Sequence, residues 1–141
     1  MKIAIIGQGY VGLTISAFAS AHFKVLGFDN NAKIVDQLNS GSSPVEDISN
    51  AQLHTAITKG AYKATTDYSA VSQASVIIMC VPTPLDEKQE PDLSLLQSAA
   101  TAIAPFVSNE TLVVSESTSY PGTLRDIIIP TIDSLKPKDS V

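Results

Sequence analysis

A glycine-rich turn near the start of the chain limits what this sequence can fold into. Met1 to Ile6 is a short apolar run, and Gly7-Gln8-Gly9-Tyr10-Val11-Gly12 follows it directly. Apolar residues then recur at the spacing of a one-sided helix, at Val11, Ile15, Phe18 and Ala19. A second apolar run, Val25 to Phe28, ends at Asp29. This order of strand, glycine turn, helix, strand and acid predicts a dinucleotide-binding βαβ unit.

The residue types in the turn match what a diphosphate requires. Gly7 allows a tight turn, Gly9 leaves the backbone open to a pyrophosphate, and Gly12 lets the helix pack close to the strand. The helix N-terminus adds free N–H groups and the positive end of the helix dipole. Asp29 would accept hydrogen bonds from both hydroxyls of an adenosine ribose, and its charge would repel a 2′-phosphate. The motif therefore predicts NAD as cofactor; the alternative is glycines that serve only the turn.

The same segment can also be interpreted as a secretory signal peptide. Met1-Lys2 would begin it, and Ala19-Ser20-Ala21 would supply a small-residue cleavage site. The glycines interrupt the apolar stretch, however, and the helical stripe continues past them on one face only. These features favour the βαβ interpretation. No apolar run approaches the length of a membrane span.

Composition narrows the class of protein further. A chain of 141 residues is long enough for one domain with its own core. Its net charge of −5, without a cluster of Lys and Arg, argues against nucleic acid or an anionic membrane as partner. The single cysteine, Cys80, fits a reducing, cytoplasmic compartment, and its apolar surroundings predict an inert thiol with a raised pKa. No His/Cys/Asp grouping has metal-ligand spacing, so we expect no metal.

The rest of the chain alternates predicted helices and strands. Further strands are expected at Tyr62 to Thr65, at a sheet edge, at Ser75 to Val81, buried on both faces, and at Thr111 to Ser115. Asn30 or Asn31, the pair Ser49 and Gln52, Asp67 and Asp92 have capping positions before the helices between them. This alternation predicts an α/β fold of the Rossmann type: a doubly wound, mainly parallel sheet with helices on both faces.

The end of the chain is predicted to be a helix followed by a linker-like segment. A last helix would bury Ile127, Ile128, Thr131 and Leu135, and Pro130 is expected to kink it or end it early. We expect one cofactor domain over residues 1–135 and a linker-like end over 136–141.

Several unusual residues fall at the ends of predicted strands. Gly7-Gln8-Gly9 follows the first strand, Asp29 the second, Pro82-Thr83-Pro84 the fourth and Glu116-Ser117-Thr118 the fifth. The proline segment by itself fits a rigid loop, and the last segment fits helix capping. Because ligands of parallel sheets bind beyond the carboxyl ends of the strands, their shared location predicts one cofactor site. Lys33, one turn beyond Asp29, can reach the same ribose or remain solvated.

These motifs resemble those of the nucleotide-sugar 6-dehydrogenases, the UDP-glucose/GDP-mannose dehydrogenase family. The resemblance runs in the family's order through almost the whole chain. Its segments are Gly7 to Leu13, Gly27 to Asp29, Leu38 to Gly41, Ser43 to Ile48, Ala64 to Asp67, Val81 to Leu85, Glu90 to Ser94 and Glu116 to Thr123. The Pro44-to-Ile48 stretch, Leu85 and the Tyr120-Pro121 pair are most similar to the branch that oxidises UDP-N-acetylhexosamines.

The resemblance implies an activity and a set of site residues. The family oxidises the C6 alcohol of a UDP-sugar to a carboxylate with two NAD+, through a covalent cysteine intermediate, usually for polysaccharide biosynthesis. Thr118 would lie near the nicotinamide half and orient the water used in the chemistry, and Glu116 receives no proton-transfer role. The cofactor-binding residues implied are Gly7, Gly9, Tyr10, Val11, Gly12, Asp29, Lys33, Val81, Pro82, Thr83, Glu116, Ser117 and Thr118.

The family's pattern also extends further than this chain. The catalytic cysteine of the family lies in a downstream UDP-sugar-binding domain, which is absent here, and Cys80 does not match its motif. We therefore expect this piece to bind NAD without turnover, with most contacts to the UDP-sugar made by the missing domain. The full-length protein is expected to form a homo-oligomer.

Two other functions fit parts of the sequence. A non-enzymatic NAD-sensing module has a similar length and begins with the same fingerprint, and dehydrogenases of the 3-hydroxyacid or 6-phosphogluconate type share the domain. Neither accounts for Thr83 between two prolines or for the segment from Glu116 to Thr123.

Overall fold

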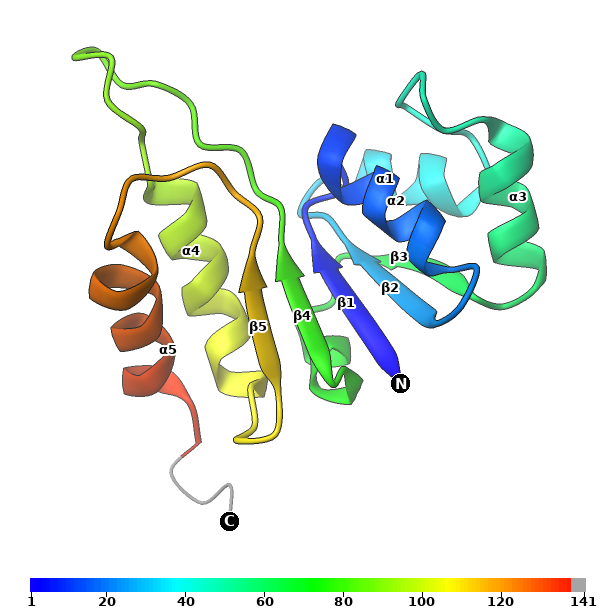
Figure 1. The fold of residues 1–141 in the computed structure, drawn as a ribbon. Coiled ribbons are helices and arrows are strands. Elements are labelled where there is room, and N and C mark those ends of the chain that lie inside the picture. Colours follow the sequence, from blue (N-terminus) through cyan, green and yellow to red (C-terminus); the bar gives the residue numbers. More distant parts are fainter. Residues whose placement is uncertain (138–141) are drawn as a thin grey trace.

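The chain folds around one five-stranded parallel sheet with the strand order β3-β2-β1-β4-β5 (Figure 1). The computed structural model describes residues 1–137. The strands are β1 (Lys2–Ile6), β2 (Lys24–Phe28), β3 (Tyr62–Thr65), β4 (Val76–Met79) and β5 (Leu112–Ser115). The helices are α1 (Tyr10–Ala19), α2 (Ala32–Asn39), α3 (Asn50–Thr58), α4 (Ser94–Ile103) and α5 (Ile129–Leu135). Shorter helical segments are η1 (Tyr68–Gln73), η2 (Ala104–Phe106) and η3 (Leu124–Ile128).

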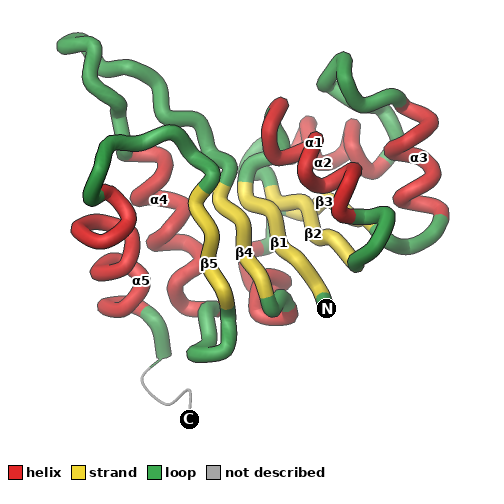
Figure 2. The backbone as a smooth tube through the Cα atoms, in the orientation of Figure 1, coloured by secondary structure: helices red, strands yellow, loops and turns green. Residues whose placement is uncertain are grey.

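Helices cover both faces of the sheet, as Figure 2 shows by the red segments on either side of the yellow strands. Side chains of β1 alternate between two cores. Ile3 and Ile5 pack with residues of α1, α2 and α3, whereas Ala4 and Ile6 pack with residues of η1, α4 and α5. Because neighbours along a strand point to opposite faces, a strand buried on both sides must be apolar throughout. The predicted doubly wound Rossmann fold is confirmed.

Local signals set several boundaries as the sequence predicts. Asn31, rather than Asn30, caps α2, and Ser49 and Gln52 form a capping box at the start of α3. Asp67 caps η1 by accepting a hydrogen bond from the Ser69 N–H. Asp92 likewise accepts one from the Ser94 N–H at 2.9 Å, one residue before the N-cap position of α4. Each cap satisfies an N–H group that has no partner inside its helix.

The predicted stripe of α1 is only half right. Ile15 and Ala19 pack against the core, but Val11 and Phe18 are 49% and 67% exposed, and the fully buried residues of the helix are Gly12, Leu13 and Ser16. Gly12 lies on this face because the helix backbone approaches the end of β1 very closely. The polar Ser16 is accommodated there because its hydroxyl has a buried partner in Gln8, at 3.1 Å. Apolar periodicity could not show this, because small and polar residues take the place of the usual large ones.

The C-terminal helix also departs from the prediction. The chain does not leave the helix at Pro130: a π-helical segment, η3, leads directly into α5, which continues to Leu135. Pro130 lies in the first turn of α5, directly after the π-helical segment. Ile128 and Ile132 are buried, whereas Leu135 is half-exposed. The predicted linker-like end lies mostly outside the described residues, in 138–141.

A Gly12→Ala substitution should destabilise the fold. An added Cβ would lie 1.8 Å from the Gly7 carbonyl oxygen, which is backbone and cannot rotate away. We expect a loss of at least about 2 kcal/mol in the free energy of unfolding, measured by urea denaturation. Gly9→Ala is the matched control, because its Cβ would meet no atom within 4 Å. Equal stability of the two variants would contradict this account of the packing.

Candidate functional site

A cleft of about 520 Å³ opens at the carboxyl ends of β1, β2, β4 and β5. It lies where the strand order reverses, between β1 and β4, which is the position at which open parallel sheets bind ligands. Four loops contribute its walls: the glycine turn after β1, the turn after β2, the proline segment after β4 and the loop after β5 (Figure 1). Residues from widely separated parts of the chain therefore meet at one edge of the sheet.

Most of the predicted site residues line this cleft. They are Gly7, Gly9, Tyr10, Val11, Asp29, Val81, Pro82, Thr83, Glu116, Ser117 and Thr118. Gly12 does not line it, because it is buried beneath the turn, and Lys33 lies exposed on α2 outside the lining. Asn30, Asn31, Ile34 and Cys80 also line the cleft, although sequence reasoning did not select them. Their position next to predicted site residues was the available signal.

The three glycines have different reasons to lack a side chain. Gly7 has φ = +92°, and a Cβ there would lie 2.6 Å from the Cys80 carbonyl oxygen. Position 12 must be glycine because a Cβ there would clash with the backbone of Gly7, whereas a Cβ on Gly9 would meet open space. Packing within the protein therefore explains Gly7 and Gly12 but not Gly9. Gly9 is exposed at the N-cap of α1, where its backbone is accessible to a ligand.

Asp29 faces the glycine turn. One carboxylate oxygen accepts a hydrogen bond from the Gln8 N–H at 3.0 Å, and the other accepts one from the Asn31 N–H at 2.9 Å. These contacts orient the carboxylate at the mouth of the cleft while leaving it partly exposed. Asp29 thus combines a structural contact with the turn and free acceptor capacity toward the cleft.

The loop after β5 is tied back to β4. The Glu116 N–H donates to the Met79 carbonyl at 2.9 Å, and the Ser117 hydroxyl donates weakly to the same oxygen at 3.4 Å. Thr118 is exposed at the cleft, while Thr123, five residues on, makes the turn into η3 by donating to the Tyr120 carbonyl. Thr123 occupies the N-cap position of η3 without a side-chain capping bond, so helix capping does not explain the Thr118 hydroxyl.

Cys80 lies at the base of the cleft, between the glycine turn and the loop after β4. Burial, and secondarily the negative charge of Glu116, raises the pKa of its thiol to about 11. The thiol is therefore neutral at physiological pH, which agrees with the predicted inert cysteine. It is half-buried and not enclosed in the core.

A second, apolar hollow of about 440 Å³ adjoins the cleft and was missed by sequence reasoning. It shares Gly7, Asp29, Asn30, Val81 and Pro82 with the cleft. Phe28, Tyr68, Leu95 and Ala102 help to line its far side. The available signal was a second stripe on α4, formed by Leu95, Ser98 and Ala102 beside the buried one. The hollow is wide and apolar enough for a flat ring.

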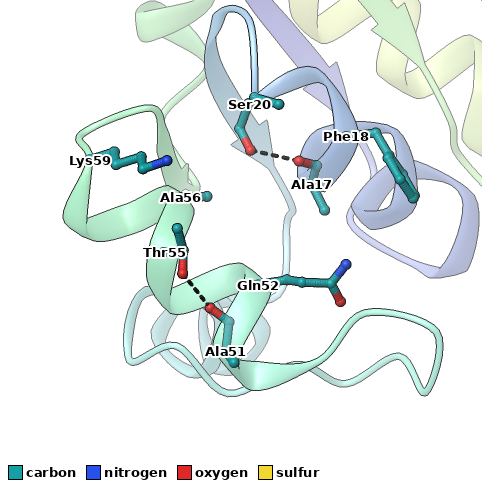
Figure 3. Close-up of a pocket in the computed structure, with 9 residues that line it drawn as sticks. Ala17, Phe18, Ser20, Ala51, Gln52, Thr55, Ala56 and Lys59 are labelled. Atoms are coloured by element: carbon teal, nitrogen blue, oxygen red, sulfur yellow. Dashed lines mark hydrogen bonds between the residues drawn. The ribbon is translucent and has the colours of Figure 1, made fainter.

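A separate groove lies between α1 and α3, on the outer side of the sheet (Figure 3). Phe18, Gln52 and Lys59 help to line it, and none of the predicted site residues does. The hydroxyls of Ser20 and Thr55 donate to carbonyls of their own helices, at 2.8 Å each. Both hydroxyls are thus satisfied within the protein, and the groove is separate from the residues of the cofactor motifs.

Within residues 1–137, no three His, Cys, Asp or Glu residues gather in a way that could hold a metal ion. None of the helices found there is long and apolar enough to cross a membrane.

Comparison with known proteins identifies relatives of this chain. Over 129 residues the chain is 40% identical to a UDP-N-acetyl-D-mannosamine dehydrogenase from Campylobacter jejuni, covering 89% of this chain and 31% of that protein. A UDP-glucose 6-dehydrogenase from Haloferax volcanii is 34% identical over 142 residues, covering 98% and 33% respectively. The chain thus spans about a third of the length of the curated relatives it matches.

A solved structure shows the same fold at similar identity. The ternary complex of GDP-mannose dehydrogenase from Pseudomonas aeruginosa superposes with a TM-score of 0.91 at 33% identity, over 96% of this chain and 32% of that one. The family model described as the UDP-glucose/GDP-mannose dehydrogenase family, NAD binding domain, matches residues 1–140. The chain therefore belongs to this family and forms its NAD-binding domain, with the glycine turn, the acid after β2 and the four-loop cleft as parts of that domain.

Proposed function

We propose that the cleft binds NAD with its pyrophosphate against the glycine turn and the N-terminus of α1. This proposal depends on the observation that four loop segments meet at one cleft. One of them contains Gly9, whose lack of a side chain is not required by packing. Gly7, Gly9, Tyr10 and Val11 would contact the pyrophosphate, with Gly12 acting from beneath by permitting the close approach of α1. Free N–H groups and the helix dipole favour negative charge at this point.

Asp29 would hold the adenosine ribose, and the apolar hollow beyond it would take the adenine. Its carboxylate stands between the cleft and the hollow and lines both. An adenine in the hollow would lie between Val81 on one side and the side chains of α4 on the other. Lys33 lies outside both linings, so its role at the ribose would require its long side chain to reach back over Asp29.

The nicotinamide half would extend toward β4 and β5. Val81, Pro82 and Thr83 form one wall there, and Glu116, Ser117 and Thr118 form the other. When bound, NAD supplies the hydride acceptor of the reaction. We assign Thr83 and Thr118 to positioning this half of the cofactor, and Thr118 to orienting water at the reacting carbon.

For the whole protein we propose oxidation of the C6 alcohol of a UDP-sugar to a carboxylate with two NAD+. A UDP-N-acetylhexosamine is the favoured substrate, because the 40% identical relative is named for such a sugar. Residues 1–135 would form the cofactor domain, joined through 136–141 to the part that binds the UDP-sugar. We further propose a cytoplasmic homo-oligomer, in which Cys80 stays reduced.

An NAD-sensing module remains the second candidate from the sequence, but the family match argues against it. The match extends through residue 140 and thus includes the loop after β5, for which a sensor has no use. Cofactor binding is common to both functions, so turnover by the full-length protein distinguishes them.

The cofactor prediction concerns binding selectivity. Calorimetry should show NAD+ binding at least about tenfold more tightly than NADP+, because the Asp29 carboxylate would face the added 2′-phosphate. Gly9→Ala should weaken NAD+ binding while leaving the free energy of unfolding nearly unchanged. Tighter binding of NADP+ than of NAD+ would refute the assignment of Asp29.

Thr118→Ala tests the proposed role in the reaction. In the full-length protein, ADP-ribose binding should stay nearly intact, while kcat with a UDP-N-acetylhexosamine, followed as NADH formation, should fall by at least about tenfold. Ser119→Ala, whose side chain does not line the cleft, is the control. Unchanged turnover in Thr118→Ala would remove this residue from the mechanism. The substrate itself is identified by assaying the unaltered full-length protein with a panel of UDP-sugars.

The reactivity of Cys80 provides a pH-dependent prediction. A raised pKa leaves less thiolate at every pH below it, so alkylation by iodoacetamide at pH 8 should be about a hundredfold slower than for the urea-unfolded chain. The rate should rise with pH until about 11, where the thiol ionises. Saturating NAD+ should slow it further by covering the cleft. Rapid alkylation of the folded protein at neutral pH would show an activated cysteine instead.

A further inference from the structure

A buried polar cluster lies directly behind the glycine turn, and none of its residues lines the cleft. Its members are Gln8, Ser16 and Tyr62, which are at most 3% exposed. The Gln8 side-chain oxygen accepts hydrogen bonds from the Tyr62 hydroxyl at 2.9 Å and from the Ser16 hydroxyl at 3.1 Å. The Gln8 amide nitrogen donates to the carbonyls of Ile5 at 3.1 Å and Gly7 at 3.2 Å.

The cluster joins four parts of the chain at one residue of the turn. Gln8 is the second residue of the turn, Ser16 lies on α1, Tyr62 lies on the edge strand β3, and Ile5 lies on β1. All four hydrogen bonds converge on the side-chain amide of Gln8, which donates two and accepts two and so uses its whole hydrogen-bonding capacity. Because buried amides are costly unless satisfied, this arrangement holds Gln8 in one position.

Gly27 makes room for the cluster. A Cβ on this residue of β2 would lie 2.5 Å from the Gln8 side-chain oxygen and 2.6 Å from the Tyr62 hydroxyl. The strand therefore omits a side chain where the amide and the phenol meet. This fit indicates that the cluster is a packed part of the fold and not a chance contact.

The backbone of Gln8 connects the cluster to the proposed cofactor site. Its N–H donates to Asp29 at 3.0 Å, and its side-chain amide donates to the carbonyl of Gly7. The residue after Gln8, Gly9, is the N-cap of α1. Displacement of Gln8 would thus move the turn, while Asp29 would keep its hydrogen bond from the Asn31 N–H at 2.9 Å. Burial, and secondarily the charge of Asp29, raises the pKa of Tyr62 above its usual range, so its hydroxyl stays a donor at physiological pH.

We propose that Gln8, Ser16 and Tyr62 are positioning residues that fix the glycine turn in the geometry that receives the pyrophosphate of NAD. None of them reaches the ligand; they act through the backbone of residues 7–9. This inference rests on the proposed binding mode in the cleft. It assigns part of the cofactor affinity to a tyrosine on the far edge strand of the sheet.

A purely structural role makes a different prediction. If the cluster served only stability, removal of its hydroxyls would lower the free energy of unfolding but leave the affinity of the folded protein for NAD+ unchanged. A positioning role predicts loss of affinity for ligands that carry the diphosphate, with little loss for adenosine, which would use the apolar hollow and the ribose contact.

The test compares two ligands on a small set of variants at a temperature where all are folded. We expect the double variant Ser16→Ala, Tyr62→Phe to bind NAD+ about tenfold more weakly by calorimetry, because Gln8 loses both donors to its oxygen. Adenosine affinity, followed by NMR titration, should change less than about twofold. Ser20→Ala is the matched control: it removes another buried hydroxyl immediately after α1, one bonded only to the Ala17 carbonyl.

Each outcome decides a different point. Unaltered NAD+ affinity in the double variant, or an equal loss for adenosine and NAD+, would overturn the positioning role while leaving NAD binding in the cleft intact. Absence of NAD+ binding by the unaltered protein would instead overturn the binding mode on which the inference rests. Should the double variant fail to fold, the two single variants serve, each with an expected loss of about threefold.

Discussion

The close approach of α1 to the end of β1 is the contact on which the rest of this structure depends. Gly7 and Gly12 meet there with no space for a side chain on either, and Cys80 of the neighbouring strand closes the third side. Because the backbones come this near, the N-terminus of the helix opens onto the edge of the sheet where three other loops end. A larger residue at Gly7 or Gly12 would push the helix away and separate the walls of the cleft.

Two kinds of interaction maintain this geometry from opposite sides. On the solvent side, Asp29 accepts the Gln8 N–H and links the turn to the end of β2. On the buried side, the Gln8 side chain is held by hydroxyls from α1 and β3. The turn is therefore fixed before any ligand arrives, and a preorganised site loses less free energy to ordering when it binds. The exposed Gly9 and Thr118 remain available because other residues carry the structural contacts.

The order of elements and most of their caps could be predicted because they rest on local signals. Three signals each act within a few residues: the apolar runs of the strands and helices, the capping box at Ser49, and the spacing of the glycines. Predictions failed where distant parts of the chain decide. Two positions of the stripe assigned to α1 were wrong, because Ser16, with Gln8 as its partner, is buried in place of Val11 and Phe18. The helix does not end at Pro130, since η3 leads directly into α5.

The parallel α/β fold, the glycine turn and the candidate residues at four strand ends follow from the amino-acid sequence alone. Spacing and residue type are local properties, and the strand-end rule then places distant loops at one edge. Three-dimensional packing was needed to show which glycine is free of contacts, that Gly12 lies beneath the cleft and Lys33 outside it, and that an apolar hollow adjoins Asp29. The partnership of Gln8 with Tyr62 belongs to the same class, because 54 residues separate them and the pairing of β1 with β2 and of β2 with β3 brings them together.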